Sequence, residues 1–138
     1  MSDTVRDIMN PQLLYVSEDD APLAVRAKLV HFGVSGAPVL DRTYRPIGFV
    51  SLRDFSADGS TMRVSRPAVT TLDDVPIEAA ARALSDASLR HLVVVDGAAR
   101  AVGVVSAIDL VRAFAGLSSR HPARFDVDCS SGEAFPDG

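Results

Sequence analysis

The sequence holds a single cysteine, Cys129, among its 138 residues. One cysteine forms no disulfide within the chain and no cysteine-rich metal site, and such a composition suits a reducing compartment. We therefore expect a cytoplasmic location. No stretch reaches the ~18 apolar residues that a membrane-spanning helix needs, and residues 1–10 carry charged side chains without an apolar run. The sequence thus predicts neither a membrane span nor an export signal.

Positive charge is also scarce. The chain has 14 basic and 18 acidic side chains, which gives a net charge of −4 at pH 7. Binding to nucleic acid or to an anionic membrane normally requires a basic surface. We expect neither partner, although one local basic pocket is compatible with this overall charge.

Motifs of catalytic and metal sites are missing as well. The sequence contains no Gly-x-Ser-x-Gly elbow, no His-Glu-x-x-His or Cys-x-x-Cys pair, and no Gly-x-x-x-x-Gly-Lys phosphate loop. A hydrolytic triad needs a nucleophile and a base within hydrogen-bond distance, and a transition-metal site needs clustered histidines or cysteines. We expect no catalytic residues, no metal and no enzymatic activity.

What the sequence does contain is an internal repeat. The run Gly-Phe-Val-Ser-Leu-Arg-Asp at residues 48–54 returns as Gly-Val-Val-Ser-Ala-Ile-Asp at residues 103–109, a displacement of 55 positions. The same displacement relates Leu40-Asp41 to Val95-Asp96. A displacement that holds over such a stretch is typical of a duplicated structural unit. Two small units sharing one core fit a chain of this length with 47% hydrophobic residues.

Each unit is predicted to fold as β-α-β-β-α. In the first unit we expect a strand at residues 13–16, a helix over 22–33, paired strands at 37–40 and 47–50, and a short helix from Leu52. In the second unit the same elements are expected at residues 69–72, 76–87, 92–95, 101–105 and 107–117. Residues 92–95 are apolar at every position, which is typical of a sheet covered on both faces. Neither unit could bury its strands alone.

The domain organisation that we expect has four parts. These are a first unit at residues 1–56, a polar linker at 57–61, a second unit at 62–117 and a flexible acidic tail at 118–138. The linker consists of small and polar residues. The tail has four acidic residues, two arginines, two prolines and only sparse apolar positions, a composition that favours disorder.

Both units contain the pattern Gly-x-x-Ser-x-x-Asp, which places a serine at the start of a helix and an aspartate one helical turn later. Ser51 is followed by Asp54, and Ser106 is followed by Asp109. Such a pair is either a capping box that only stabilises the helix end, or a carboxylate that accepts the hydroxyls of a ribose beside a helix end that favours phosphate. Both interpretations remain open on the sequence.

A helix followed by a hairpin and this signature, occurring twice, resembles a tandem pair of cystathionine-β-synthase (CBS) domains, the Bateman module. The resemblance covers residues 5–117. It implies an α/β (α+β) fold of two βαββα repeats packed through their sheets with pseudo-twofold symmetry. It also implies a non-catalytic regulatory module, which binds AMP, ADP, ATP or S-adenosylmethionine between the repeats and signals by a change of shape or assembly. These are regulatory ligands, and no cofactor is expected.

The resemblance also implies two clefts, because the serine and aspartate of one repeat face the first strand and the helix-to-strand junction of the other. The first cleft is expected to contain Ser51, Asp54, Val69, Thr70, Arg90, His91 and Leu92. The second, weaker cleft is expected to contain Leu14, Tyr15, Ser35, Gly36, Ala37, Ser106 and Asp109. Only the first has basic side chains that can meet a phosphate. Within it, Val69 and Leu92 are predicted to sandwich an adenine ring.

The basic residues of the first cleft have simpler explanations too. An arginine at a helix end, such as Arg90, can satisfy the terminal carbonyls, and His91 can be a half-buried residue at a sheet edge. Arg53 stands next to Asp54, and we expect it to be a solvated helix residue rather than a ligand contact.

The resemblance finally implies that two modules pair, so we expect a homodimer and a regulated protein that the sequence does not identify. The apolar faces of the short helices near Leu52 and Leu110 are the predicted self-association surface. The alternative is a structural or dimerisation module without a physiological ligand. In that case Ser51 and Ser106 are only helix caps.

Overall fold

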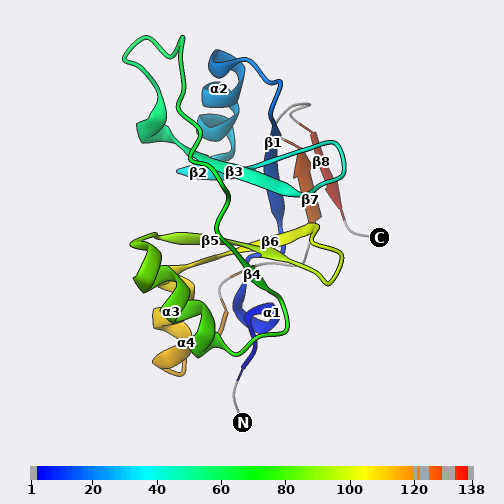
Figure 1. Ribbon diagram of the computed structural model, residues 1–138, viewed down its shortest axis with the longest axis vertical. Coiled ribbons are helices and arrows are strands. Elements are labelled where there is room, and N and C mark those ends of the chain that lie inside the picture. Colours follow the sequence, from blue (N-terminus) through cyan, green and yellow to red (C-terminus); the bar gives the residue numbers. More distant parts are fainter. Residues whose placement is uncertain (1–2, 120, 122–124, 129–132, 137–138) are drawn as a thin grey trace.

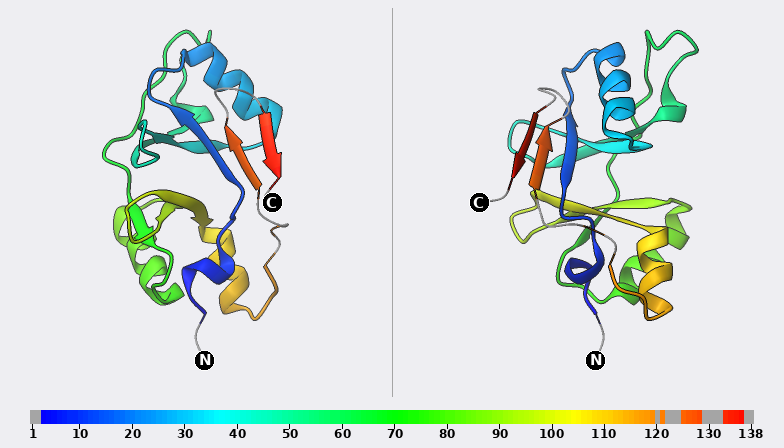
Figure 2. Two further views of the ribbon diagram at one scale, coloured as in Figure 1. Left: turned by 90° about the vertical axis from the view of Figure 1, so that its right-hand side faces the viewer. Right: turned by 180° about the vertical axis from the view of Figure 1, so that it is seen from behind.

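The computed structural model describes residues 3–119, 121, 125–128 and 133–136. Two small units lie one above the other, with their sheets facing each other in the middle and the larger helices on the outer sides (Figures 1 and 2). This arrangement confirms the predicted α/β class and the packing of two repeats through their sheets. None of the described helices combines the length and the apolar character that crossing a bilayer requires.

The second unit repeats the element order of the first, as the repeat in the sequence predicts, but the last helix is shorter in the first unit. The first unit contains β1 (Leu13–Ser17), α2 (Pro22–Phe32), β2 (Gly36–Leu40), β3 (Pro46–Ser51) and the 3₁₀ turn η1 (Leu52–Asp54). The second unit contains β4 (Thr70–Leu72), α3 (Ile77–Ala87), β5 (His91–Val95), β6 (Ala101–Ser106) and α4 (Ala107–Phe114). The helix predicted from Leu52 is therefore a single 3₁₀ turn, whereas its counterpart α4 has eight residues.

The strand pairing is the same in both units. β1 runs parallel to β2, which is antiparallel to β3, and β4 runs parallel to β5, which is antiparallel to β6. Each antiparallel pair has one irregularity in register, between Val39 and Leu40 and between Val94 and Val95. These positions are again 55 residues apart, so the duplication extends to the local irregularity of the hairpin.

Alternate residues of β5 face opposite sides of the sheet. Leu92 and Val94 are buried against the helices of the second unit. Val93 is buried toward the first unit, where it packs with Leu13 and Leu40. The sheets are thus covered on both faces, as the apolar strands predict, and neither unit could bury its strands alone.

The N-terminal helix α1 (Val5–Ile8) packs on the second unit, although we assigned residues 1–56 to the first. Val5 is fully buried in the core of the second unit, and its N–H donates to the carbonyl oxygen of Val75 at 3.0 Å. The backbone of Asn10 pairs with Val104 on β6. A Cβ on the motif glycine Gly103 would lie 2.6 Å from the Asn10 carbonyl oxygen, so glycine is required where the N-terminal segment crosses β6.

The chain after α4, expected to be a flexible tail, contributes two strands among its described residues. β7 (Phe125–Asp128) runs parallel to β1, and β8 (Glu133–Pro136) is antiparallel to β7. The sheet of the first unit therefore has the order β3-β2-β1-β7-β8 (Figure 1). The side-chain composition did not indicate this pairing because strand addition at a free sheet edge depends on backbone hydrogen bonds.

Candidate functional site

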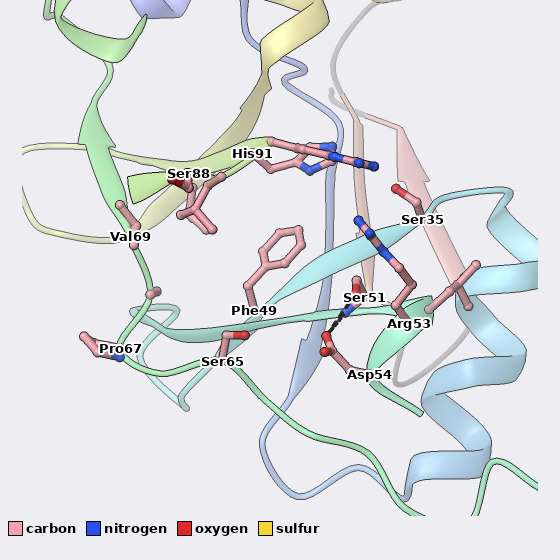
Figure 3. A pocket seen from close by; sticks show the side chains of 15 residues that line it. Ser35, Phe49, Ser51, Arg53, Asp54, Ser65, Pro67, Val69, Ser88 and His91 are labelled. Atoms are coloured by element: carbon pink, nitrogen blue, oxygen red, sulfur yellow. Dashed lines mark hydrogen bonds between the residues drawn. The ribbon is translucent and has the colours of Figure 1, made fainter. Parts of the chain in front are cut away.

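A cavity of about 720 Å³ lies between the two units, within the size range of small-ligand sites (Figure 3). Its first wall comes from the end of β3 and the turn η1, and its second wall from the segment that precedes β4 and the junction between α3 and β5. The residues that line it are Ser35, Phe49, Ser51, Leu52, Arg53, Asp54, Ser65, Pro67, Ala68, Val69, Ser88, Leu89, Arg90, His91 and Val93. The cavity therefore lies where the first cleft is predicted.

The first wall presents the repeated serine and aspartate. The Ser51 N–H and hydroxyl both donate to Oδ2 of Asp54, at 2.7 and 3.0 Å (Figure 3). The other carboxylate oxygen, Oδ1, accepts no hydrogen bond from the residues that the structure describes. One oxygen of Asp54 thus holds the turn, and the other remains available at the cavity.

Two arginines line the same cavity. Arg53 extends from η1 toward the side of the cavity where His91 lies (Figure 3), and Arg90 ends the connection that leads into β5. Both side chains are exposed, and neither guanidinium has an ion-pair or hydrogen-bond partner within the described part of the chain. Arg53 is exposed, as expected of a solvated residue, and it is also part of the cavity wall.

An aromatic pair joins the two units at the cavity. The ring of Phe49 on β3 stacks on the imidazole of His91 on β5, with centroids 5.7 Å apart and an interplanar angle of 17° (Figure 3). Burial lowers the pKa of His91 below its ordinary value of 6.5, the nearby Asp109 carboxylate opposes this, and Arg90 adds to it. The lowered pKa favours the neutral imidazole, which offers a flat surface without charge.

The second copy of the motif has a different environment. The Ser106 N–H donates to Oδ2 of Asp109 at 2.9 Å, and the Asp109 N–H donates to the serine hydroxyl oxygen at 3.1 Å, which completes a capping box for α4. Oδ1 of Asp109 lies 2.7 Å from Nε2 of His121. Asp109 is buried, whereas Asp54 is partly exposed. The two aspartates therefore occupy equivalent positions but differ in access.

Five of the seven residues predicted for the first cleft line the cavity, namely Ser51, Asp54, Val69, Arg90 and His91. Thr70 and Leu92 do not line it. Each directly follows a lining residue, and neighbouring residues of extended backbone face opposite sides. Leu92 is 1% exposed in the core of the second unit, and Thr70 is exposed to solvent. The predicted sandwich of Val69 and Leu92 is wrong, and Phe49 and His91 are the ring-bearing residues of this site.

The residues predicted for the second cleft are only partly gathered. Leu14 and Ala37 are buried in the core of the first unit, and the Tyr15 ring packs edge-on against Tyr44. Ser35 lines the first cavity instead, because β2 begins beside the end of β3, where Gly36 pairs with Ser51. Ser106 and Asp109 remain together and contact His121 through the aspartate.

The sequence analysis did not identify Phe49, nor the other lining residues Leu52, Ser65, Pro67, Ala68, Ser88, Leu89 and Val93. Phe49 lies two residues before Ser51 on the same strand, so the period of two could have placed both on one face. Ser65 reaches the cavity because its backbone pairs with Phe49 outside the named strands, and no sequence pattern announces such a bridge. Among the described residues no group of three or more His, Cys, Asp or Glu side chains could hold a metal ion.

Comparison with known proteins identifies the family. The CBS domain family matches the chain twice, at residues 5–57 and 62–116. A curated relative, a homoserine O-acetyltransferase of Methanosphaerula palustris, is 31% identical over 108 residues. That match covers 74% of this chain and 22% of the relative, so the chain spans about a fifth of that enzyme's length.

Solved structures show the same fold. The CBS domain pair of protein MJ0100, in complex with 5′-methylthioadenosine and S-adenosyl-L-methionine, has a TM-score of 0.75 at 21% identity, over 84% of this chain and 98% of that one. CBSX2 in complex with AMP has a TM-score of 0.71 at 26% identity, over 82% and 96%. The cytosolic domain of the Mg²⁺ channel MgtE in complex with ATP has a TM-score of 0.69 at 28% identity, over 77% and 46%. Since the family matches both repeats and the fold agrees throughout, this chain belongs to the CBS domain family as a tandem pair.

Proposed function

We propose that this CBS pair is a regulatory module that binds a phosphorylated adenosine, namely AMP, ADP or ATP, in the cavity between its repeats. The observation that carries the proposal is that one cavity holds both an available carboxylate oxygen, on Asp54, and two unpaired guanidiniums, on Arg53 and Arg90. A carboxylate accepts the hydroxyls of a ribose, and guanidiniums bind phosphate. The cavity thus supplies a partner for each polar part of a nucleotide.

The remaining lining suits the base. Phe49 and neutral His91 offer ring surfaces, and Val69, Leu89 and Val93 provide apolar contacts. Aromatic groups prefer such stacked or edge-on contacts with other rings, and ligand sites are mostly apolar with a few placed polar groups. An adenine ring can therefore lie against this wall while its ribose reaches Asp54.

Charge favours a phosphorylated ligand over S-adenosylmethionine. Solved relatives bind AMP, ATP, 5′-methylthioadenosine or S-adenosyl-L-methionine, so the family alone does not choose. In this cavity two guanidiniums stand against the one carboxylate of Asp54. The sulfonium cation of S-adenosylmethionine is repelled by a site with net positive charge, whereas a phosphate forms charge-assisted hydrogen bonds with the guanidiniums.

The output is proposed to be a change of shape or assembly, without catalysis. Any such shift is limited by the difference in ligand affinity between two conformations. The homodimer surface that we propose is the exposed apolar face of α4, formed by Ile108, Val111 and Phe114. Leu110, near which we expected this surface, is itself 4% exposed and belongs to the core. The regulated protein and the cytoplasmic location remain predictions.

The test is a calorimetric titration of the purified chain with AMP, ATP, S-adenosylmethionine and adenosine, repeated on Arg90→Ala. We expect saturable binding of AMP and ATP, weaker binding of adenosine and of S-adenosylmethionine, and a selective loss of affinity for the phosphorylated ligands in the variant. Tightest binding of S-adenosylmethionine would overturn the choice of ligand. No heat from any ligand, with an unchanged dimer mass, would favour the structural or dimerisation module.

A further inference from the structure

The two aspartates of the repeat differ in what contacts their outer carboxylate oxygen. Oδ1 of Asp54 has no hydrogen-bond partner among the described residues and faces the cavity. Oδ1 of Asp109 contacts Nε2 of His121 at 2.7 Å, with the two side chains only 3% and 12% exposed. A separation of 2.7 Å is typical of a charge-assisted hydrogen bond. A group of the protein itself therefore occupies the position that is available to a ligand in the first repeat.

The contact is additional to the cap of α4. The capping box uses Oδ2 of Asp109 together with the hydroxyl and N–H of Ser106, whereas the His121 contact uses the other carboxylate oxygen, Oδ1. Helix α4 would keep its cap if the histidine were removed. The His121 contact thus has no role in starting the helix, and it can be tested separately from it.

The chain turns sharply at the end of α4, before it reaches His121. Gly116 adopts a left-handed conformation with φ of 76°, which ends α4 in a turn. The Leu117 N–H then donates to the carbonyl oxygen of Arg112 at 2.8 Å, and Nη2 of Arg112 donates to the carbonyl oxygen of Ser118 at 2.9 Å. These bonds hold residues 117 and 118 against the last turn of α4.

The strand that follows His121 reaches the other side predicted for the second cleft. β7 pairs with β1 in a register that places Val127 beside Leu14 and Asp128 beside Tyr15 (Figure 2). The resemblance to a CBS pair implies that Leu14 and Tyr15 face Asp109 across this cleft. Two described contacts of the C-terminal segment, on Asp109 and on β1, thus fall on the predicted second cleft.

We propose that the second cleft takes the chain's own C-terminal segment as its ligand, with the imidazole of His121 on the carboxylate oxygen that a ribose hydroxyl would use. The protein then binds one nucleotide per chain, in the cavity of the first repeat. The docking of His121 stands on its own contacts, whereas the stoichiometry rests on the proposed function.

The first arm of the test needs no ligand. Hydrogen–deuterium exchange of the backbone amides of β7 is compared among the wild type, His121→Ala and the control His31→Ala, which removes an exposed histidine from α2. We expect exchange in β7 to become about ten-fold faster or more in His121→Ala, as the loss of a charge-assisted hydrogen bond implies, and to stay unchanged in His31→Ala. Equal exchange in all three proteins would overturn the docking of the segment.

The second arm counts ligands by calorimetry with AMP and adenosine. We expect one site per chain in the wild type and in His31→Ala, two in His121→Ala, and one again in the double variant His121→Ala/Asp109→Asn. A single site in His121→Ala despite faster exchange in β7 would overturn the role of the segment as an internal ligand. If no protein binds AMP or adenosine, the proposed function is overturned. The exchange data then still decide whether the C-terminal segment docks through His121.

Discussion

Replacing Asp54 by asparagine separates ligand binding from helix capping. In the wild type the Ser51 N–H donates to Oδ2 of Asp54 at 2.7 Å, and the side-chain oxygen of asparagine can accept the same bond. The residue is partly exposed, and such polar substitutions change the free energy of unfolding by about 0.5 kcal/mol or less. We expect Asp54→Asn to unfold at nearly the wild-type urea concentration in the absence of ligand.

Nucleotide binding should respond far more strongly. Hydrogen bonds to a charged group contribute about 1.5–3 kcal/mol each, and asparagine lacks the charge that strengthens the bonds from the ribose hydroxyls. At about 1.4 kcal/mol for each factor of ten, the loss of one such bond raises the Kd for AMP roughly 10- to 100-fold. The assay is calorimetric titration with AMP at constant salt, with urea unfolding of the same samples.

The matched control is Asp109→Asn, the same change at the equivalent position of the second repeat. Asp109 is buried and bonded to His121, so we expect a loss of about 1–3 kcal/mol in the free energy of unfolding and little change in the affinity for AMP. Equal weakening of AMP binding in both variants would contradict a specific role of Asp54 in the site. A loss of stability in Asp54→Asn with unchanged affinity for AMP would contradict it as well.

Three further predictions concern charge, protonation and backbone contact. Arg53→Ala should weaken binding of ATP more than binding of adenosine, and an equal loss for both ligands in calorimetry would contradict a phosphate role. Burial lowers the pKa of His91, so its contribution to stability is complete above pH 6.5 and is lost as the pH falls below that value. Urea unfolding from pH 7.5 to 5.5 should show this loss in the wild type and a shallower slope in His91→Asn, and parallel slopes would count against it. Gly103→Ala places a Cβ 2.6 Å from the Asn10 carbonyl oxygen and should lower the free energy of unfolding by about 1–3 kcal/mol. Gly97→Ala, which has no neighbour within 4 Å of the added Cβ, should leave the midpoint of thermal unfolding nearly unchanged.

The repeat made the fold predictable from the sequence. The glycines at 48 and 103 recur because another segment crosses close to each strand there, as the contacts of a Cβ with Ser65 and Asn10 demonstrate. The serines and aspartates recur because each hairpin leads into a capped turn or helix. These are local requirements of one supersecondary unit, so their spacing in the sequence is enough to find them.

Residues of the cavity could be predicted only where the sequence also shows which side of its strand a residue occupies. The sequence locates the start of β5 but leaves open which of two neighbouring residues faces the cavity, so Leu92 was misplaced. Phe49, on β3, was overlooked although it lies on the same face as Ser51. The contact between Asp109 and His121 depends on how the chain returns after α4. No periodicity in the sequence indicates this contact, because the two residues are twelve positions apart and a turn at Gly116 separates them.

The most direct test of the proposed nucleotide site is a crystal structure of the chain grown with saturating AMP. We expect one AMP molecule in the cavity between the repeats, with its ribose on Asp54, its phosphate beside Arg53 and Arg90, and His121 still on Asp109. AMP bound against Asp109 instead, or an empty cavity at saturating AMP, would overturn the proposed site.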